Sequence, residues 1–185
     1  MEDNEIVELY FKRSDKAISE TDKKYGAYCS HIAYNILSNV QDTEECVNDT
    51  WLAAWNSIPP HRPQSLRTFL GKITRRLSLM KLRSRNRLKR GSGSVAVALE
   101  EIGECMPSSD NVETAVEEKE LTEAVNTFLR TLGKTERDVF VCRYWYFAPI
   151  ADISKGLGFT ESKIKSLLYR TRNKLRAYLQ EEGYL

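Results

Sequence analysis

The stretch PIADISKGLGFTESKIKSLLYRTRNKL, residues 149–175, decides the fold of the C-terminal half of the chain. Pro149 suits a first helical turn, and Gly158 can adopt the positive φ that ends a helix. Thr160 then stands where an N-cap belongs, with a hydroxyl that can accept a backbone amide of the next helix. A short helix, a glycine turn and a capped second helix together predict a helix-turn-helix.

The second helix of this unit has an apolar side and a polar side. The apolar side carries Ile164, Leu167, Leu168 and Leu175. The opposite side has an uncharged centre, which suits base edges, and cationic flanks, which suit the phosphates on either side of a groove. A merely solvated surface helix is the alternative, but a single acid, Glu161, offsets seven Lys/Arg between Lys155 and Arg176. The pattern favours DNA binding through the face that holds Ser162, Ser166, Tyr169 and Asn173.

Charge is strongly segregated along the 185 residues, although 28 basic residues nearly balance 26 acidic ones. Residues 62–90 contain eleven Lys/Arg and no acid, whereas residues 91–120 contain eight acids and one lysine. This distribution predicts two basic surfaces joined by an acidic connector.

Helical spacing prevails throughout, so the sequence predicts an all-α fold with helices near residues 3–12, 14–38, 42–57, 65–88, 113–131, 136–146, 149–157 and 161–181. The segment GSGSVAVALEEIGECMPSSDN, residues 91–111, interrupts the pattern with Gly, Ser and Pro. We therefore expect two small helical domains, residues 1–90 and 113–185, joined by a flexible acidic linker over 91–112.

The basic helix of the N-terminal domain begins near Leu66. One face of this helix is apolar, and the opposite face is rich in Lys and Arg. This pattern predicts a helix that packs on the core through the first face and binds nucleic-acid phosphate through the second. A membrane-surface helix is less favoured, because the apolar side lacks tryptophan and is continuous enough to be consumed by packing. That apolar stripe consists of Leu66, Phe69, Leu70, Ile73, Leu77 and Met80.

An acidic helix precedes it in DTEECVNDTWLAAWNSI, residues 42–58. Asp42 and Thr43 can cap this helix, and its tryptophans belong to the buried side. The acids that remain outside cannot bind DNA, so this face predicts a protein partner. It comprises Asp42, Glu45, Asn48, Asp49 and Leu52.

Little supports an enzyme. His31 and His61 are the only histidines, and there is no phosphate-binding glycine loop or nucleophile motif. The four cysteines, Cys29, Cys46, Cys105 and Cys142, have neither metal-ligand spacing nor the pattern of a disulfide framework. We expect no cofactor and no metal. Without a signal peptide or a membrane-spanning run, the chain is expected to be cytoplasmic.

Three motifs in order resemble the extracytoplasmic-function (ECF) sigma factors of bacterial RNA polymerase, the two-domain form of the sigma-70 family. They are DTEECVNDTWLAAW (42–55), FLGKITRRLSLMKLRSR (69–85), and LRTLGKTERDVFVCRYW (129–145) followed by ISKGLGFTESKIKSLLYRTRNKLRAYL (153–179). The resemblance implies promoter-specific transcription initiation, with core polymerase (the β′ clamp helices and the β flap) and promoter DNA as partners. It also implies an anti-sigma factor.

The resemblance assigns residues to three contacts. The polymerase clamp would contact Asp42, Glu45, Asn48, Asp49 and Leu52. The minus-ten element would be bound and opened by the loop over residues 59–65 and by Lys72, Arg75, Arg76, Lys81 and Arg83. The minus thirty-five element would be read by Lys165, Ser166, Tyr169 and Arg170, with Lys163 and Arg172 on phosphates.

Two positions depart from the family pattern. Arg76 stands where the family often has Asn, and Met80 where it often has Asp. Because Met80 continues the apolar stripe, we expect it to pack in the core.

An autonomous helix-turn-helix regulator is the main alternative. It shares the C-terminal unit but leaves the tryptophan-rich acidic helix and the second basic helix without a role. Such a regulator would also normally dimerise, and the chain has no sustained heptad repeat.

Overall fold

The computed structural model describes residues 1–86, 94–107 and 115–185, and within these ranges every regular element is an α-helix. The all-α prediction is thereby confirmed. The chain divides into two compact units, Met1–Gly91 and Ser92–Leu185, each with its own buried core.

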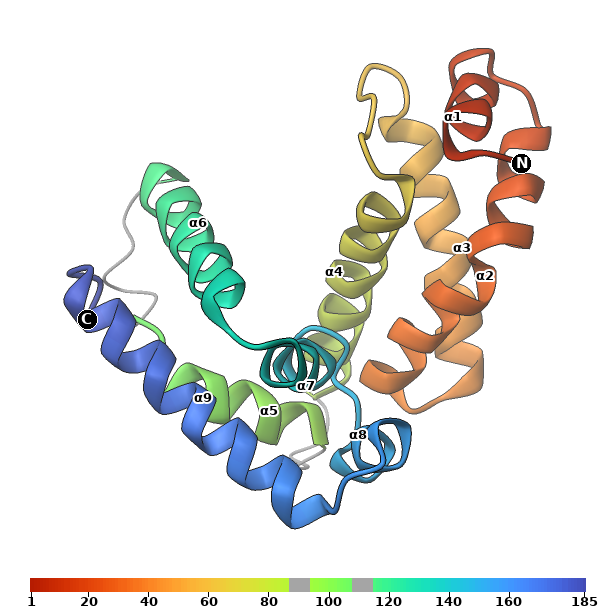
Figure 1. Ribbon diagram of the computed structural model, residues 1–185. Coiled ribbons are helices and arrows are strands. Elements are labelled where there is room, and N and C mark those ends of the chain that lie inside the picture. The colour runs from red at the N-terminus through yellow and green to blue at the C-terminus, as the bar shows by residue number, and fades with distance from the viewer. Residues whose placement is uncertain (87–93, 108–114) are drawn as a thin grey trace. The chain divides into compact units, whose positions relative to one another are not determined.

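The first unit consists of α1 (Asp3–Phe11), α2 (Lys16–Leu37), α3 (Val40–Ser57) and α4 (Leu66–Asn86). Helices α2, α3 and α4 pack against one another, and α1 packs against α2 (Figure 1). Apolar side chains from all four helices meet in the core, among them Tyr10, Cys29, Trp51 and Leu70. Burying this surface is the main driving force for the fold of the unit.

A strip of buried hydroxyls and a thiol joins α3 to α4. Thr50 Oγ1 donates to Thr74 Oγ1 at 3.2 Å, and Cys46 Sγ lies 3.1 Å from Ser78 Oγ. Thr74 and Ser78 are fully buried, and each also donates to the backbone carbonyl four residues earlier. Their burial is tolerated because each hydroxyl has partners.

These buried polar residues correct the apolar stripe predicted for α4. The buried side runs through the predicted Leu66, Leu70 and Ile73 and continues through Thr74 and Ser78, whereas Met80 is 58% exposed. The prediction that Met80 packs in the core was wrong, because two polar residues that hydrogen-bond within the helix take the core positions instead.

The second unit consists of α5 (Ser94–Gly103), α6 (Ala115–Thr131), α7 (Lys134–Tyr144), α8 (Ile150–Leu157) and α9 (Glu161–Glu181). Gly158 ends α8 with φ of 67°, and the Thr160 side chain accepts from the Lys163 amide at 3.3 Å. Helix α9 packs against α6, α7 and α8 and buries Ile164, Leu168 and Leu175. The predicted helix-turn-helix is therefore present at residues 150–181.

Helix α5 lies inside residues 91–112, the predicted flexible linker. It belongs to the second unit and packs against α7, with Val95, Ala98 and Cys105 buried along this segment. The buried positions follow helical spacing, but small side chains and the neighbouring Gly and Ser residues hide it in the sequence. The second unit thus begins earlier than the predicted boundary at 113, and the remaining linker residues 91–93 and 108–112 lie outside the described ranges.

Candidate functional site

The polar side of α9 is displayed as the sequence predicted. Leu167, Leu168 and Ile164 face the core, so the residues between them point outward. Tyr169 is 60% exposed, which is unusual for a large aromatic side chain and makes its ring available to a partner. The four predicted readers line one shallow hollow on the surface: Lys165, Ser166, Tyr169 and Arg170.

Three cations of this face make local contacts, and Lys165 Nζ lies 3.9 Å from Glu161 Oε2. Lys163 Nζ lies 3.5 Å from the centre of the Phe159 ring, a cation–π contact at the turn of the motif. Arg170 Nε donates to the Ser166 carbonyl at 3.3 Å, one turn earlier in α9. All three residues are exposed, so these contacts orient the cations without removing them from solvent.

Arg172 differs from the other predicted DNA contacts. Its side chain is only 16% exposed, and Nη1 donates to the Tyr144 hydroxyl at 2.7 Å and lies 3.5 Å from Glu101 Oε2. Burial lowers the pKa of Arg172, but the Tyr144 hydrogen bond and the Glu101 charge raise it by more. The guanidinium is therefore committed inside the second unit, which disfavours the predicted phosphate contact.

The predicted DNA-binding cations of α4 also divide into exposed residues and residues that are partly buried or paired with acids. Lys72, Arg76 and Arg83 are exposed, as a phosphate-binding face requires. Arg75 is half-buried, and burial lowers its pKa. Lys81 pairs with two acids of α3, lying 3.2 Å from Asp42 Oδ1 and 2.5 Å from Glu45 Oε2.

The outward face of α3 is acidic with an apolar centre. Asn48 and Asp49 are exposed, and Leu52 is 58% exposed beside them. Asp42 is half-buried and pairs with Lys81, while Glu45 remains largely exposed. The helix also begins earlier than predicted: the Asn39 side chain caps it by accepting from the Asp42 amide at 2.9 Å. An exposed leucine among acids suits a protein partner with basic and apolar groups.

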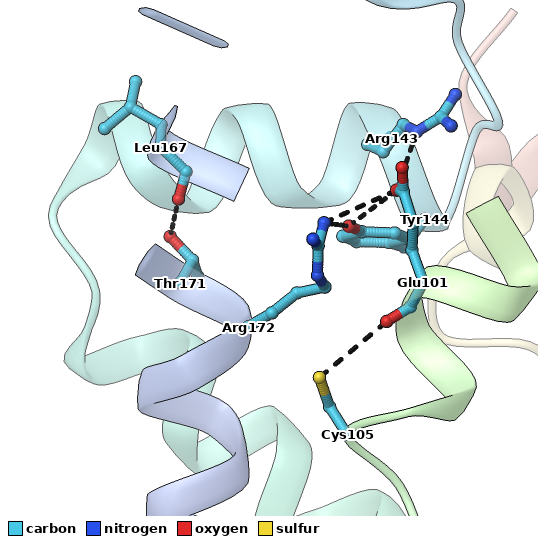
Figure 2. A network of polar contacts seen from close by, with 7 residues as sticks. All are labelled: Glu101, Cys105, Arg143, Tyr144, Leu167, Thr171 and Arg172. Carbon is cyan, nitrogen blue, oxygen red and sulfur yellow. Dashed lines mark hydrogen bonds and ion pairs between the residues drawn. The ribbon is translucent and has the colours of Figure 1, made fainter. Parts of the chain in front are cut away.

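Glu101 is the residue that sequence reasoning missed. It lies on α5 and contacts Arg143 and Tyr144 of α7 as well as Arg172 of α9 (Figure 2). Burial raises the pKa of Tyr144 to about 12, so its hydroxyl remains a donor at neutral pH. The spacing of Val95, Ala98 and Cys105 could have revealed the helix, but nothing local identifies the partners of Glu101.

Anion binding is the chemistry that the exposed cations of α4 and α9 can perform. Within the described residues, no group of three or more His, Cys, Asp or Glu side chains is placed to hold a metal ion. No helix in these same ranges has the length and apolar character needed to cross a membrane.

Comparison with known proteins points to one family. Residues 23–88 match the family model of sigma-70 region 2, and residues 128–177 match that of sigma-70 region 4. The chain is 26% identical over 153 residues to the ECF RNA polymerase sigma factor SigE of Mycolicibacterium smegmatis, covering 82% of this chain but only 57% of that relative's length. A solved structure of CnrH in complex with the cytosolic domain of CnrY aligns with 98% of this chain and 99% of its own, at a TM-score of 0.44 and 18% identity.

Proposed function

Because the chain belongs to the sigma-70 family as an extracytoplasmic-function member, we propose that it binds core RNA polymerase and directs transcription from specific promoters. The observation that carries this proposal is the display of two unlike surfaces by one chain. An acidic face with an exposed leucine lies on α3, and a polar face with flanking cations lies on the second helix of a helix-turn-helix. The first suits a protein and the second suits DNA.

The α3 face is the proposed polymerase contact. Asp49, Asn48 and Leu52 are exposed at its centre, and Glu45 and Asp42 continue it toward the start of the helix. The polymerase clamp helices are the proposed partner, since family membership assigns them to this helix. Charged side chains at such a surface steer the encounter, while the exposed leucine contributes apolar area.

Two DNA contacts complete the proposal. Helix α4 would bind the minus-ten element through Lys72, Arg76 and Arg83, which are the predicted cations that α4 exposes most openly among the described residues. Helix α9 would read the minus thirty-five element through Lys165, Ser166, Tyr169 and Arg170. The β flap is the proposed polymerase contact of this second unit. Each basic surface is small, so holding both on polymerase raises the effective concentration of one site once the other is bound.

Regulation by an anti-sigma protein follows from the same family membership. Such a protein would cover the surfaces on α3 and α4, or the surface on α9, and prevent polymerase from binding. Since its proposed partner is core polymerase, we propose that the chain acts in the cytoplasm.

Run-off transcription tests the proposal directly. Purified core polymerase is mixed with the chain and with fragments of genomic DNA, and core polymerase alone is the control. We expect discrete transcripts that depend on the chain and share upstream sequences at two positions. Transcripts that are the same with and without the chain would contradict the proposal, and sequence-specific duplex binding without polymerase would instead favour an autonomous regulator.

A further inference from the structure

Glu101 ties α5 to two helices of the DNA-binding unit (Figure 2). Its Oε2 accepts from the Tyr144 hydroxyl at 3.1 Å and from Arg143 Nε at 3.4 Å, both on α7. The same oxygen lies 3.5 Å from Arg172 Nη1 on α9. One carboxylate oxygen therefore joins three helices, and one of them carries the proposed reading face.

The Tyr144 hydroxyl strengthens this junction by using both of its hydrogen-bonding roles. It donates to Glu101 and accepts from Arg172 Nη1 at 2.7 Å. A phenol that donates and accepts at once is fixed in orientation, so the ring also fixes the distance between α7 and α9 at this level.

Among Glu101, Arg143, Tyr144 and Arg172, Glu101 is the residue whose charge matters most. The Arg143 side chain is 4% exposed and that of Arg172 is 16% exposed, and both guanidinium groups contact the same carboxylate. Without the negative charge, two like charges would face each other in a site with little water. Arg172 is the more exposed of the two, so displacement of its side chain and of the adjoining turn of α9 relieves the repulsion at least cost.

Displacement at Arg172 would act on the reading face. Tyr169 and Arg170 precede Arg172 by three and two residues, within a single helical turn. Thr171, between Arg170 and Arg172, is buried and packs in the core, so this turn of α9 has one side on the core and the other on the surface. A shift of that turn moves the side chains that would meet base edges.

We propose that Glu101 is a positioning residue for promoter reading. Through Arg172 and Tyr144 it holds α9 on α7, and α5 is therefore a working part of the DNA-binding unit and not a tether. Glu101 itself touches no DNA in this account. The inference rests on the proposed function of α9 as the reader of the minus thirty-five element.

The test uses the full chain with Glu101→Gln, which removes the charge and keeps the size and an acceptor oxygen. Glu100→Gln is the matched control, because Glu100 is an exposed acid on the same helix. Tyr144→Phe is the second variant, since it removes only the relaying hydroxyl. The first measurement is hydrogen–deuterium exchange of the α9 amides, without DNA or polymerase. We expect faster exchange over residues 165–172 in Glu101→Gln and Tyr144→Phe, and exchange at the wild-type rate in Glu100→Gln.

The second measurement is selectivity for DNA. The wild-type chain with core polymerase first selects duplexes from a random pool, and each variant is then compared on a selected duplex and on a scrambled one. We expect the ratio of the two affinities to fall about tenfold in Glu101→Gln, which is the size of one lost base contact. Glu100→Gln should keep the wild-type ratio.

The outcomes separate the inference from the proposed function. A lower unfolding temperature in Glu101→Gln with an unchanged selectivity ratio would mean that Glu101 only stabilises the unit, and would overturn the inference. Unchanged exchange in α9 would overturn it as well. A wild-type chain that selects no sequence with core polymerase would defeat the proposed function itself.

Discussion

The ammonium nitrogen of Lys81 on α4 lies 3.2 Å from a carboxylate oxygen of Asp42 on α3, and 2.5 Å from one of Glu45. Burial lowers the pKa of Lys81, but the two carboxylates raise it by more. A cation that the family resemblance assigns to DNA thus pairs with two acids that it assigns to polymerase. The basic helix and the acidic helix are joined at this point.

Lys81 should therefore contribute less to DNA binding than its charge suggests. Lys72→Ala removes an exposed cation of α4, whereas Lys81→Ala removes one already paired with two acids. Salt dependence is the slope of log affinity for the promoter against log salt concentration. We expect Lys72→Ala to reduce the magnitude of this slope by about 0.7–0.9, and Lys81→Ala to leave the slope unchanged. The slope is measured for the complex of chain, core polymerase and promoter. An equal reduction in both variants would show that Lys81 leaves its acids and contacts phosphate.

Asp49→Lys should abolish binding to core polymerase without unfolding the first unit. The side chain is exposed in the middle of α3, so the reversed charge disturbs a partner and not the core. Binding is measured by retention on immobilised core polymerase, and folding by circular dichroism. Glu44→Lys makes the same charge change at another exposed position of α3 and should retain binding. Full retention of Asp49→Lys with a native spectrum would contradict the assignment of this face.

Local rules predicted the helix-turn-helix because its stop and start signals lie next to each other in sequence. A glycine with positive φ and a threonine cap act within a few residues, so Gly158 and Thr160 define the turn without reference to the rest of the chain. The exposure of the polar side of α9 followed from periodicity alone.

Charge predicts which face of a helix is polar but not which partner a cation has. The family resemblance assigns Lys81 and Arg172 to DNA, yet each pairs with an acid from another helix. Those acids, Asp42 and Glu101, lie 39 and 71 residues away in sequence. The prediction for Met80 was wrong for a related reason. Thr74 and Ser78 take the buried positions because α3 and their own helix supply hydrogen-bond partners for their hydroxyls.

Arg170→Ala should weaken reading of the minus thirty-five element. The residue is exposed beside Tyr169 and makes no contact with the core, so its loss leaves the unit folded. If its guanidinium reaches a base edge, binding of a cognate promoter should weaken by about 1–3 kcal/mol, and less for a promoter with that base changed. Transcription from both promoters measures the difference. Equal transcription by variant and wild type from the cognate promoter would remove Arg170 from the readers.

Tyr144 should make stability depend on alkaline pH. Burial, as the largest cause, raises its folded-state pKa to about 12 from an ordinary value of 10. Its protonated form is thus favoured by folding, so the contribution is complete below about pH 10 and is lost as the pH rises from 10 to 12. Over that window the wild type should lose about 2 kcal/mol more free energy of unfolding than Tyr144→Phe, measured by urea denaturation. Parallel losses in the two proteins would contradict the raised pKa.

The most direct measurement compares binding of one promoter duplex by the chain alone, by core polymerase alone and by the two together. A duplex recovered by run-off transcription is titrated with each, beside a scrambled duplex of the same composition. We predict weak and unselective binding by the chain alone, and tight binding that prefers the promoter only when both are present. Tight, sequence-specific binding by the chain alone, unchanged by core polymerase, would contradict the account.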